Sequence, residues 1–478
     1  MYTFFGRETE MAELNDRFIG PRSEFFIIYG RRRVGKSELI NEFIRQNKGL
    51  RIQVREGSRK YQLEQFAEAF SEFFDDPFIG KNGFTSWDSV FEYLASRLTN
   101  RFILAIDEFP YLVKEDRKIL SILQYHWDDR LRETRIFLIL SGSSIGMMED
   151  EVLSYRSPLF GRRTGQLLLR SFRFHEVLPI FQDFRKAVEY YAVYGGTPAY
   201  ILSVNTNETI QHSIEKNLLN PLSYLFREVE FLLRMELVEL RYYFAILLSI
   251  SRGNNTQHLI TNDTGIQKGT VNRYLATLID LDIIWKEVPA FEDERSRKGR
   301  YYFRDNLFSF WFRFIFPHLE RAESGFAEQV LTENITPYLA QYTGSLFERM
   351  IIDLLFYLNG AGKLPFPCIF SSMRRWWHKG EEIDIVGISE TDSSILFCEV
   401  KWQDNVDGKK VAFDLKQKAG LISWKEKERN EMFMVIARSF SSVGDEEHVI
   451  YMDLEILEKL IHSSSSLHIP RNLTIPGR

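Results

Sequence analysis

One short loop constrains this sequence more than any other feature. Residues 24–29 form an apolar run, followed at once by Gly-Arg-Arg-Arg-Val-Gly-Lys-Ser at 30–37 and by a segment of helical composition at 38–46. A strand, a glycine-flanked loop and a helix in this order are the required setting of a P-loop, in which backbone N–H groups surround phosphate oxygens. We therefore expect a nucleoside triphosphate to bind at this loop.

Each position of the loop has a chemical reason. Gly30 and Gly35 let the backbone curl toward the phosphates, and the N-terminus of the following helix adds a favourable partial positive charge. We expect Lys36 to reach the β- and γ-phosphates and the Ser37 hydroxyl to ligate Mg²⁺. The expected nucleotide contacts of this segment are Gly30, Arg33, Val34, Gly35, Lys36, Ser37 and Glu38.

A second apolar run, at residues 101–109, contains two adjacent acids, Asp107 and Glu108. Such a run is typical of a parallel strand buried on both faces, whose C-terminal end is where α/β sheets bind ligands. We expect Asp107 to hold Mg²⁺ and Glu108 to orient or deprotonate the attacking water. A third run, at 135–140, precedes Ser-Gly-Ser-Ser at 141–144, which could either sense the γ-phosphate or form a simple turn.

This order of segments resembles the AAA-related P-loop ATPases, and more narrowly the archaeal-type ATPase family within the STAND class of signalling NTPases. The loop at 30–37 and the acidic segment at 107–112 match the Walker motifs of that family closely. Residues 5–8, Phe-Gly-Arg-Glu, match its opening box. The resemblance implies that ATP is the nucleotide and that Arg7 lies near the adenine.

Two further segments carry the same resemblance. Ser-Pro-Leu-Phe-Gly-Arg at 157–162 resembles a later box of the family, which implies that Arg162 senses phosphate. Gly-Gly-Thr-Pro-Ala-Tyr at 195–200 resembles a motif of the helical domain. In that class the proline region, here Pro198, contacts nucleotide and couples its state to the domain arrangement. A homo-oligomer is compatible with this resemblance, because an arginine supplied in trans is common in related ATPases.

The middle of the chain has a helical pattern from about residue 172 to 243, as expected of a lid that follows an ATPase core. The next segment has the element order of a winged helix, with a basic hairpin loop at 291–300 as the wing. The expected helices are 243–251, 256–262 and 269–281, and the expected strands are 283–288 and 299–303.

A winged helix suggests DNA as a partner. The third helix would face the major groove and the wing would contact phosphates. Asp280, Asp282 and the acids at 292–294 give the segment mixed charge, so a protein-binding winged helix is the alternative. The candidate DNA contacts are Lys268, Thr270, Asn272, Arg273, Arg297 and Lys298.

The C-terminal part contains two strand-like segments, at 381–387 and 394–402. Period-two alternation places Glu399 and Lys401 on one face of the second segment, and antiparallel pairing can bring Asp384 beside them. Asp384 and Glu399 could hold Mg²⁺, which would activate a water, while Lys401 positions that water or stabilises the transition state.

This arrangement resembles the PD-(D/E)xK nuclease fold. The resemblance adds Glu348, within a helix expected at 344–358, to the catalytic set of Asp384, Glu399 and Lys401. It also implies a following helix at 409–427, in which Gln417 would match a downstream glutamine. Ile383 replaces the usual proline before the aspartate. Because the D…ExK pattern is short and frequent, alternating residues on a solvated strand are the alternative interpretation.

Composition sets outer limits on these interpretations. The formal charge of −5 excludes a polycation, so any nucleic-acid binding must come from a local patch. Two cysteines, Cys368 and Cys398, cannot build a disulfide framework or a zinc site by themselves and indicate a reducing compartment. The N-terminus lacks a signal-peptide pattern, and no apolar run approaches the length of a membrane span. We expect a cytoplasmic protein without membrane contact.

The sequence thus predicts an α/β multidomain protein. Its expected parts are a P-loop ATPase core with a parallel sheet at 1–170, a helical lid at 171–240, a winged helix at 241–320 and a restriction-endonuclease-like α/β domain at 330–478. The leading hypothesis is an ATPase whose nucleotide state controls metal-dependent DNA cleavage by the C-terminal module. The alternative is an ATP-dependent switch or scaffold, such as a regulator or defence sensor, whose nuclease fold only binds nucleic acid or a protein partner.

Overall fold

The structure is a computed structural model, which describes residues 4–446 and 448–462. The chain divides into two compact units. The first unit runs to Ser171 and also includes two short stretches from later in the chain, Thr197–Ala199 and Asp280–Asp282. The second unit comprises the remainder. Within the described ranges, no helix combines the length and apolar character needed to cross a lipid bilayer.

The first unit is built on a five-stranded sheet in which every pair of neighbouring strands is parallel. Its order, β2-β3-β4-β1-β5, confirms the expected parallel sheet of a P-loop NTPase. Because neighbouring strands run in the same direction, their C-terminal ends share one edge of the sheet. The strands are β1 (Glu24–Tyr29), β2 (Gly49–Gln53), β3 (Phe102–Asp107), β4 (Ile136–Gly142) and β5 (Gly165–Leu168).

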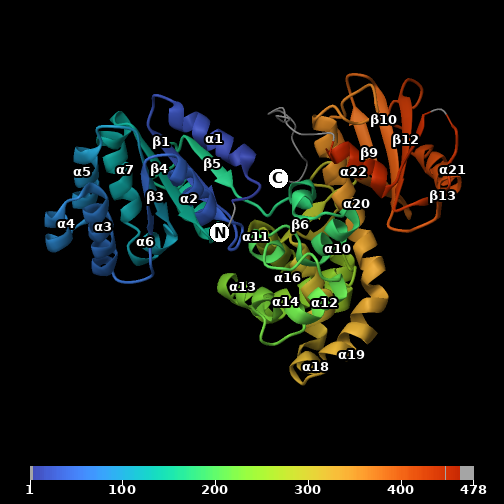
Figure 1. Cartoon of the computed structure of the whole chain (residues 1–478), viewed down its shortest axis with the longest axis horizontal. Coiled ribbons are helices and arrows are strands. Elements are labelled where there is room, and N and C mark those ends of the chain that lie inside the picture. Colours follow the sequence, from blue (N-terminus) through green and yellow to red (C-terminus); the bar gives the residue numbers. More distant parts are fainter. Residues whose placement is uncertain (1–3, 447, 463–478) are drawn as a thin grey trace. The chain divides into compact units, whose positions relative to one another are not determined.

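Helices cover both faces of this sheet, as Figure 1 shows. Alternate strand residues point to opposite faces, so the central strands contribute to two separate cores. One core joins the sheet to α3 (Arg59–Phe74), α5 (Trp87–Arg97) and α7 (Ile119–Asp129). The other joins it to α1 (Glu8–Ile19) and α2 (Lys36–Gln46). Shorter helices of this unit are α4 (Pro77–Asn82), α6 (Pro110–Glu115) and α8 (Ile145–Met147).

The second unit begins with helices that alternate with loops. A three-helix segment and an antiparallel hairpin of β6 and β7 follow, with ends that differ from the expected ones by no more than three residues. The helices are α9 (Phe174–Val177), α10 (Phe184–Tyr194), α11 (Pro198–Ile201, whose first two residues belong to the first unit), α12 (Ile210–Leu218), α13 (Glu228–Glu236), α14 (Leu240–Ser251), α15 (Gln257–Thr264) and α16 (Lys268–Asp280), and the strands are β6 (Ile284–Glu287) and β7 (Arg300–Phe303).

Local chemistry explains the ends of these helices. The Thr256 side chain accepts a hydrogen bond from the Leu259 N–H and thereby caps the N-terminus of α15. Gly265 ends α15 in the left-handed region, where φ is +67°. In α16, Val271, Tyr274, Leu275 and Leu278 are buried at helical spacing.

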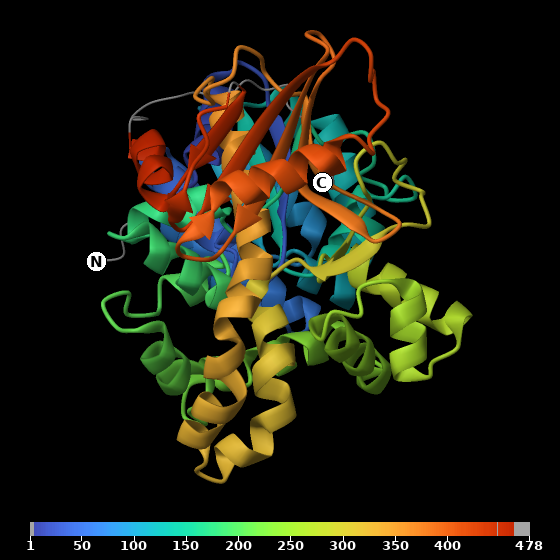
Figure 2. The ribbon, with the colours of Figure 1, turned by 90° about the vertical axis from the view of Figure 1, so that its right-hand side faces the viewer.

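A mixed five-stranded sheet, in the order β14-β12-β10-β9-β8, forms the C-terminal part. The pairs β8–β9 and β9–β10 are antiparallel, whereas β10–β12 and β12–β14 are parallel. Figure 2 shows the long helix α20 (Thr336–Gly360) beside this sheet and α21 (Gly408–Ala419) across its strands. The strands are β8 (Ser372–His378), β9 (Glu381–Ser389), β10 (Ser394–Lys401), β12 (Asn430–Ala437) and β14 (Val449–Met452). The smaller elements are α17 (Asn306–Phe310), α18 (Leu319–Glu323), α19 (Ala327–Gln329), α22 (Leu454–His462), β11 (Val406–Asp407) and β13 (Phe440–Ser442).

The expected helix at 409–427 is wrong in its second half, because α21 ends at Ala419. The chain turns at Gly420, and the Arg429 guanidinium donates to the carbonyl oxygens of Ala419 and Trp424 over 3.2 and 3.0 Å. These carbonyls therefore have partners without a further helical turn.

Candidate functional site

The P-loop joins β1 to α2 with the backbone conformation that its glycines permit. At Gly30 φ is +152°, and a Cβ there would lie 2.2 Å from the carbonyl oxygen of Leu169. At Gly35 φ is +91°, and this residue caps α2 in the left-handed region. Neither position tolerates a larger side chain without strain. Of the other expected contacts in this segment, Arg33 and Glu38 are exposed and Val34 is buried.

Lys36 and Ser37, the residues expected to contact phosphate and metal, both have hydrogen-bond partners within the protein. Lys36 is buried, and its Nζ donates to the carbonyl oxygens of Gly30 and Arg31 over 2.8 and 2.9 Å. The Ser37 hydroxyl donates to Oδ2 of Asp107 over 2.7 Å. Asp107 ends β3 and is only 1% exposed. The sheet thus brings together the hydroxyl and the carboxylate that the sequence assigns to one magnesium site.

A third polar group at this position is Arg51, which the sequence analysis missed. It lies on β2, and its Nη1 is 2.7 Å from Oδ2 of Asp107. The parallel register pairs Gln53 with Asp107. The signal available in the sequence was a pair of alternating polar residues, Arg51 and Gln53, in an otherwise apolar short strand.

Glu108 follows β3 with φ at +57°, a conformation that is uncommon for a residue with a Cβ. Its Oε2 accepts hydrogen bonds from the Ser143 hydroxyl at 2.9 Å and from the Ser143 N–H at 3.3 Å. Ser143 follows β4, in the polar segment that the sequence marked as a γ-phosphate sensor or a turn. The structure therefore joins this serine to the candidate catalytic glutamate.

Arg7 contacts the P-loop from outside it, and Pro198 lies near the loop. The Arg7 guanidinium is buried and donates to the carbonyl oxygen of Val34 over 3.0 Å and to that of Arg170 over 2.6 Å. Arg7 thus fixes the backbone of the loop. The Pro198 Cγ lies 3.8 Å from the position that a Cβ on Gly35 would take.

The structure does not place Arg162, the expected phosphate-sensing arginine, beside the P-loop of its own chain. Arg162 precedes β5, which runs parallel to β1 and starts beside Phe26. The P-loop follows the opposite end of β1, so Arg162 lies at the other edge of the sheet, more than about 13 Å away at 3.3 Å per strand residue. Its side chain pairs instead with Asp128 over 3.0 Å. Local sequence similarity could not show this direction.

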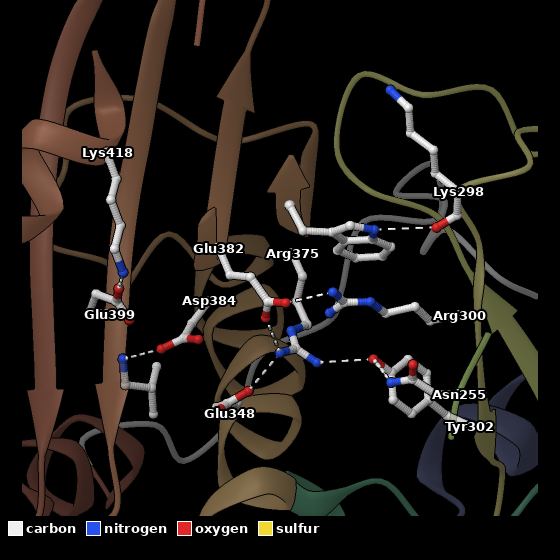
Figure 3. Close-up of polar contacts among 12 residues, drawn as sticks. Asn255, Lys298, Arg300, Tyr302, Glu348, Arg375, Glu382, Asp384, Glu399 and Lys418 are labelled. Carbon is white, nitrogen blue, oxygen red and sulfur yellow. Dashed lines mark hydrogen bonds and ion pairs between the residues drawn. The ribbon is translucent and has the colours of Figure 1, made fainter. Parts of the chain in front are cut away.

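Three of the four candidate catalytic residues of the C-terminal part, Asp384, Glu399 and Lys401, lie together on β9 and β10. Lys401 Nζ is 3.1 Å from Oε2 of Glu399 and 3.8 Å from Oδ2 of Asp384. The Val400 N–H also donates to Asp384 over 2.9 Å. Figure 3 shows Asp384 and Glu399 on neighbouring strands of this sheet. Both carboxylates are buried.

Burial and mutual contact drive the pKa values of these carboxyls apart. Burial raises the pKa of Asp384 well above its usual range, and a hydrogen bond shared with Glu399 raises it further. Burial also acts to raise the pKa of Glu399, but the hydrogen bond with Asp384 and the charges of Lys401 and Lys418 outweigh it, so that this pKa is lowered. Of the two carboxyls, Asp384 therefore has the higher pKa.

The structure corrects which residue of α21 approaches this site. Gln417, the residue expected here from the sequence, is exposed. The next residue, Lys418, forms an ion pair with Glu399. Leu415 and Ala419 are buried, so the inward face of α21 is in phase with Lys418 rather than with Gln417.

Glu348 of α20 has a different partner from the one expected. It pairs with Arg375 of β8 over 3.0 Å, and Arg375 also lies 3.6 Å from Glu382. Burial raises the pKa of Glu348, and the charge of Arg375 partly offsets this. Glu382 also pairs with Arg300 of β7 over 2.5 Å, so the charged side chains form a continuous row, as Figure 3 shows. Among residues 4–446 and 448–462, no group of three or more His, Cys, Asp or Glu side chains is arranged to hold a metal ion.

The candidate DNA contacts fall into two groups. On α16, Lys268, Asn272 and Arg273 are exposed and Thr270 is half-buried. In the hairpin loop Arg297 is exposed, but Lys298 pairs with Glu292 over 2.5 Å.

The hairpin loop, which the sequence analysis expected to contact DNA phosphates as a wing, contacts the C-terminal sheet. The Ala290 N–H donates to the Arg375 carbonyl over 2.8 Å, and the Trp377 indole N–H donates to that of Lys298 over 3.2 Å. The Arg300 guanidinium lies 4.5 Å from the centre of the Trp377 ring.

The parallel sheet with its P-loop, buried lysine and paired serine and aspartate defines a P-loop nucleoside triphosphatase. Residues 4–204 match a family described as an ATPase domain predominantly from Archaea, and residues 311–411 match a family of archaeal and bacterial proteins of unknown function. A protein of Methanocaldococcus jannaschii that carries the name "Uncharacterized protein" is 34% identical over 456 residues, which span 95% of this chain and 99% of that protein.

The chain belongs to the family of this relative, with an archaeal-type P-loop ATPase domain in its N-terminal part and the domain of unknown function in its C-terminal part. Among solved structures, the Walker-type ATPase PABY2304 of Pyrococcus abyssi is 21% identical, with a TM-score of 0.48, and covers 65% of this chain and 96% of its own. The ORC2 protein of Aeropyrum pernix, solved with ADPNP and ADP, is 12% identical, with a TM-score of 0.42, over 70% of this chain and 96% of its own.

Proposed function

We propose that the first unit hydrolyses ATP in a magnesium-dependent reaction at the P-loop. The observation that carries this proposal is the 2.7 Å hydrogen bond between Ser37 and Asp107, with Glu108 as the next residue. A hydroxyl and a carboxylate are oxygen donors of the kind that Mg²⁺ takes, and this ion commonly completes its shell with phosphate oxygens and water. The absence of a larger acidic cluster in the described ranges is therefore compatible with such a site.

Different residues have different roles in this reaction. Backbone N–H groups of residues 30–37 and the Lys36 ammonium bind the phosphates, and Lys36 exchanges its two carbonyl partners for phosphate oxygens. Glu108 orients the attacking water and accepts its proton. Magnesium held by Ser37 and Asp107 would offset the negative charge of the phosphates.

The first experiment separates nucleotide binding from hydrolysis. Lys36→Ala should lose ATP affinity, because the loop then lacks its ammonium. Glu108→Gln should bind ATP as the wild type does but hydrolyse it about 100-fold more slowly, in the range expected for loss of a general base. Binding is measured with a fluorescent ATP analogue and turnover by phosphate release. Unchanged turnover in Glu108→Gln would contradict the assigned role.

We further propose that the C-terminal part cleaves DNA phosphodiester bonds under control of the nucleotide state, in a chain organised as ATPase core (1–170), helical lid (171–240), winged helix (241–320) and nuclease-like domain (330–478). The observation that supports it is the contact of Lys401 with both Asp384 and Glu399. The two carboxylates suit a divalent cation, which would lower the pKa of a bound water. Lys401 would stabilise charge that develops on the phosphate.

A specific observation favours a second candidate, an ATP-dependent switch whose C-terminal part binds DNA or a protein without cutting. Lys401 and Lys418 both contact Glu399, and Arg375 contacts Glu348. Each of these carboxylates therefore already has a cation beside it, which a metal would have to share or displace.

Cleavage of supercoiled plasmid, linear duplex and single-stranded DNA, with Mg²⁺ or Mn²⁺ and with or without ATP, distinguishes the two candidates. A nuclease should lose cleavage in Glu399→Ala and show altered cleavage in Lys36→Ala. The exposed Glu381 on the same sheet gives a matched control, Glu381→Ala, which should cut like the wild type. Absence of cleavage on every substrate, with ATP turnover still dependent on Lys36, would leave the switch.

A further inference from the structure

Arg51 occupies a position at the nucleotide site that the proposed reaction does not yet use. Its guanidinium reaches Oδ2 of Asp107 from β2, a different strand from those that carry the Walker motifs. Asp107 is 1% exposed at its side chain and Arg51 is 23% exposed. The pair is therefore largely shielded from solvent. Opposite charges attract more strongly in such an environment than in water.

One carboxylate oxygen serves two donors here. Oδ2 of Asp107 accepts from the Ser37 hydroxyl and from Arg51, both over 2.7 Å. Oδ1 accepts from the Glu108 N–H over 3.1 Å. Arginine keeps its charge at every pH relevant to proteins, so deprotonation cannot remove it from the carboxylate. A divalent cation that approaches Ser37 and Asp107 therefore meets a fixed positive charge on the same oxygen.

We propose that Arg51 is a positioning residue of the nucleotide site, which competes with the divalent cation for Asp107 and makes binding of that cation depend on nucleotide. This inference rests on the proposed role of Asp107 as a metal ligand. A nucleotide brings several negative phosphate oxygens to Lys36 and Ser37, and a guanidinium released by Asp107 has an alternative partner among them. A divalent cation without nucleotide brings no such partner, so it must overcome its repulsion by the Arg51 guanidinium.

The test is binding of Mn²⁺ to the full chain, followed by the loss of the free-ion signal in electron paramagnetic resonance. Titrations are run without nucleotide and with a non-hydrolysable ATP analogue. All variants carry Glu399→Ala as well, so that the C-terminal carboxylates do not obscure the first unit. Arg51→Gln should bind Mn²⁺ about tenfold more tightly without nucleotide, and the analogue should enhance its affinity less than it does in the parent.

Two further variants test whether the change in Mn²⁺ affinity is specific to Arg51 and how much of it comes from the charge of Arg51. Arg55→Gln removes an exposed guanidinium whose one described side-chain hydrogen bond is to the Tyr61 hydroxyl, at 3.1 Å, and should leave Mn²⁺ affinity unchanged. Arg51→Lys keeps the charge but loses the planar fork, so its affinity should lie between those of Arg51→Gln and the parent. If thermal unfolding shows that Arg51→Gln does not fold, Arg51→Lys is compared with the parent instead. Tighter Mn²⁺ binding by Arg51→Lys than by the parent supports the inference, and equal or weaker binding refutes it.

The measurements distinguish a failure of the inference about Arg51 from a failure of the proposed metal site at Asp107, on which it rests. Asp107→Asn should weaken Mn²⁺ binding in the presence of the analogue. If it does so while Arg51→Gln binds Mn²⁺ no more tightly than the parent, the competition by Arg51 is refuted and the metal site stands. If Asp107→Asn has no effect, the metal site itself is wrong and the inference about Arg51 is overturned with it.

Discussion

Ser143 holds the carboxylate of Glu108 with two donors, its hydroxyl at 2.9 Å and its backbone N–H at 3.3 Å. The two residues follow β3 and β4, which are neighbours in the sheet. The contact fixes where the candidate base points, even though its backbone adopts a positive φ. A serine outside the Walker motifs thereby orients the glutamate that we propose as the base.

Ser143→Ala should reduce the turnover of ATP about three- to tenfold with little change in ATP affinity, because Glu108 loses a donor that orients it but no phosphate contact is removed. Phosphate-release kinetics over a range of ATP concentrations will separate the two constants. Loss of affinity with unchanged turnover would show that Ser143 acts on the nucleotide rather than on Glu108.

Arg7→Ala should lower the free energy of unfolding by about 2–4 kcal/mol, the cost of leaving the buried carbonyl of Val34 and the partly buried carbonyl of Arg170 without their donor. Urea unfolding of the full chain measures this change. Arg45→Ala is the control, because Arg45 is exposed and pairs only with Glu42 on its own helix among the ion pairs described. Equal midpoints for the two variants would contradict a structural role of Arg7.

Glu149→Gln should stabilise the protein at neutral pH and not at acid pH. Burial, together with the charges of Asp280, Asp150 and Asp282, raises the pKa of Glu149. A carboxyl with a raised folded-state pKa adds stability below its unfolded pKa of about 4.3 and loses that contribution as pH rises through the folded value. The gain from glutamine should therefore appear as pH rises above about 4.3.

Urea midpoints between pH 4 and pH 7 will check this prediction, with Glu133→Gln as an exposed control in the same unit. A gain of equal size at both ends of the range would exclude ionisation of Glu149 as its cause.

Lys268→Ala should weaken binding to duplex DNA and make the slope of log affinity against log salt less negative by about 0.9, as for one lost phosphate contact. Lys298→Ala should have a smaller effect, since Glu292 already offsets that charge. Glu292→Gln should then strengthen binding. Fluorescence anisotropy at several salt concentrations measures all three, and equal affinities throughout would remove this segment from any DNA-binding role.

Local patterns predicted what depends on neighbouring residues along the chain. The apolar run at 24–29 coincides with β1, and the acidic end of the second run coincides with the end of β3. Alternation on β10 was enough to place Glu399 and Lys401 on one face, and their 3.1 Å contact confirms it. In each case the residues involved are close in sequence, so periodicity determines their geometry.

Contacts between distant segments were not predictable in the same way. The approach of Arg51 to Asp107 depends on β2 lying next to β3, which no motif encodes. Whether Lys418 or Gln417 approaches Glu399 depends on how α21 is rotated about its own axis relative to the sheet. The position of Arg162, at the opposite end of β1 from the P-loop, depends on the direction of β5, which similarity to a sequence box does not give.

The three residues Thr197–Ala199 have a practical consequence for any attempt to produce the ATPase part alone. They belong to the first unit although the residues on either side of them belong to the second. A fragment that stops at Ser171 would lose the hydroxyl of Thr197, which lies 2.7 Å from that of Ser171, and the proline ring near Gly35. A fragment that extends to residue 204, where the ATPase family match ends, would keep both.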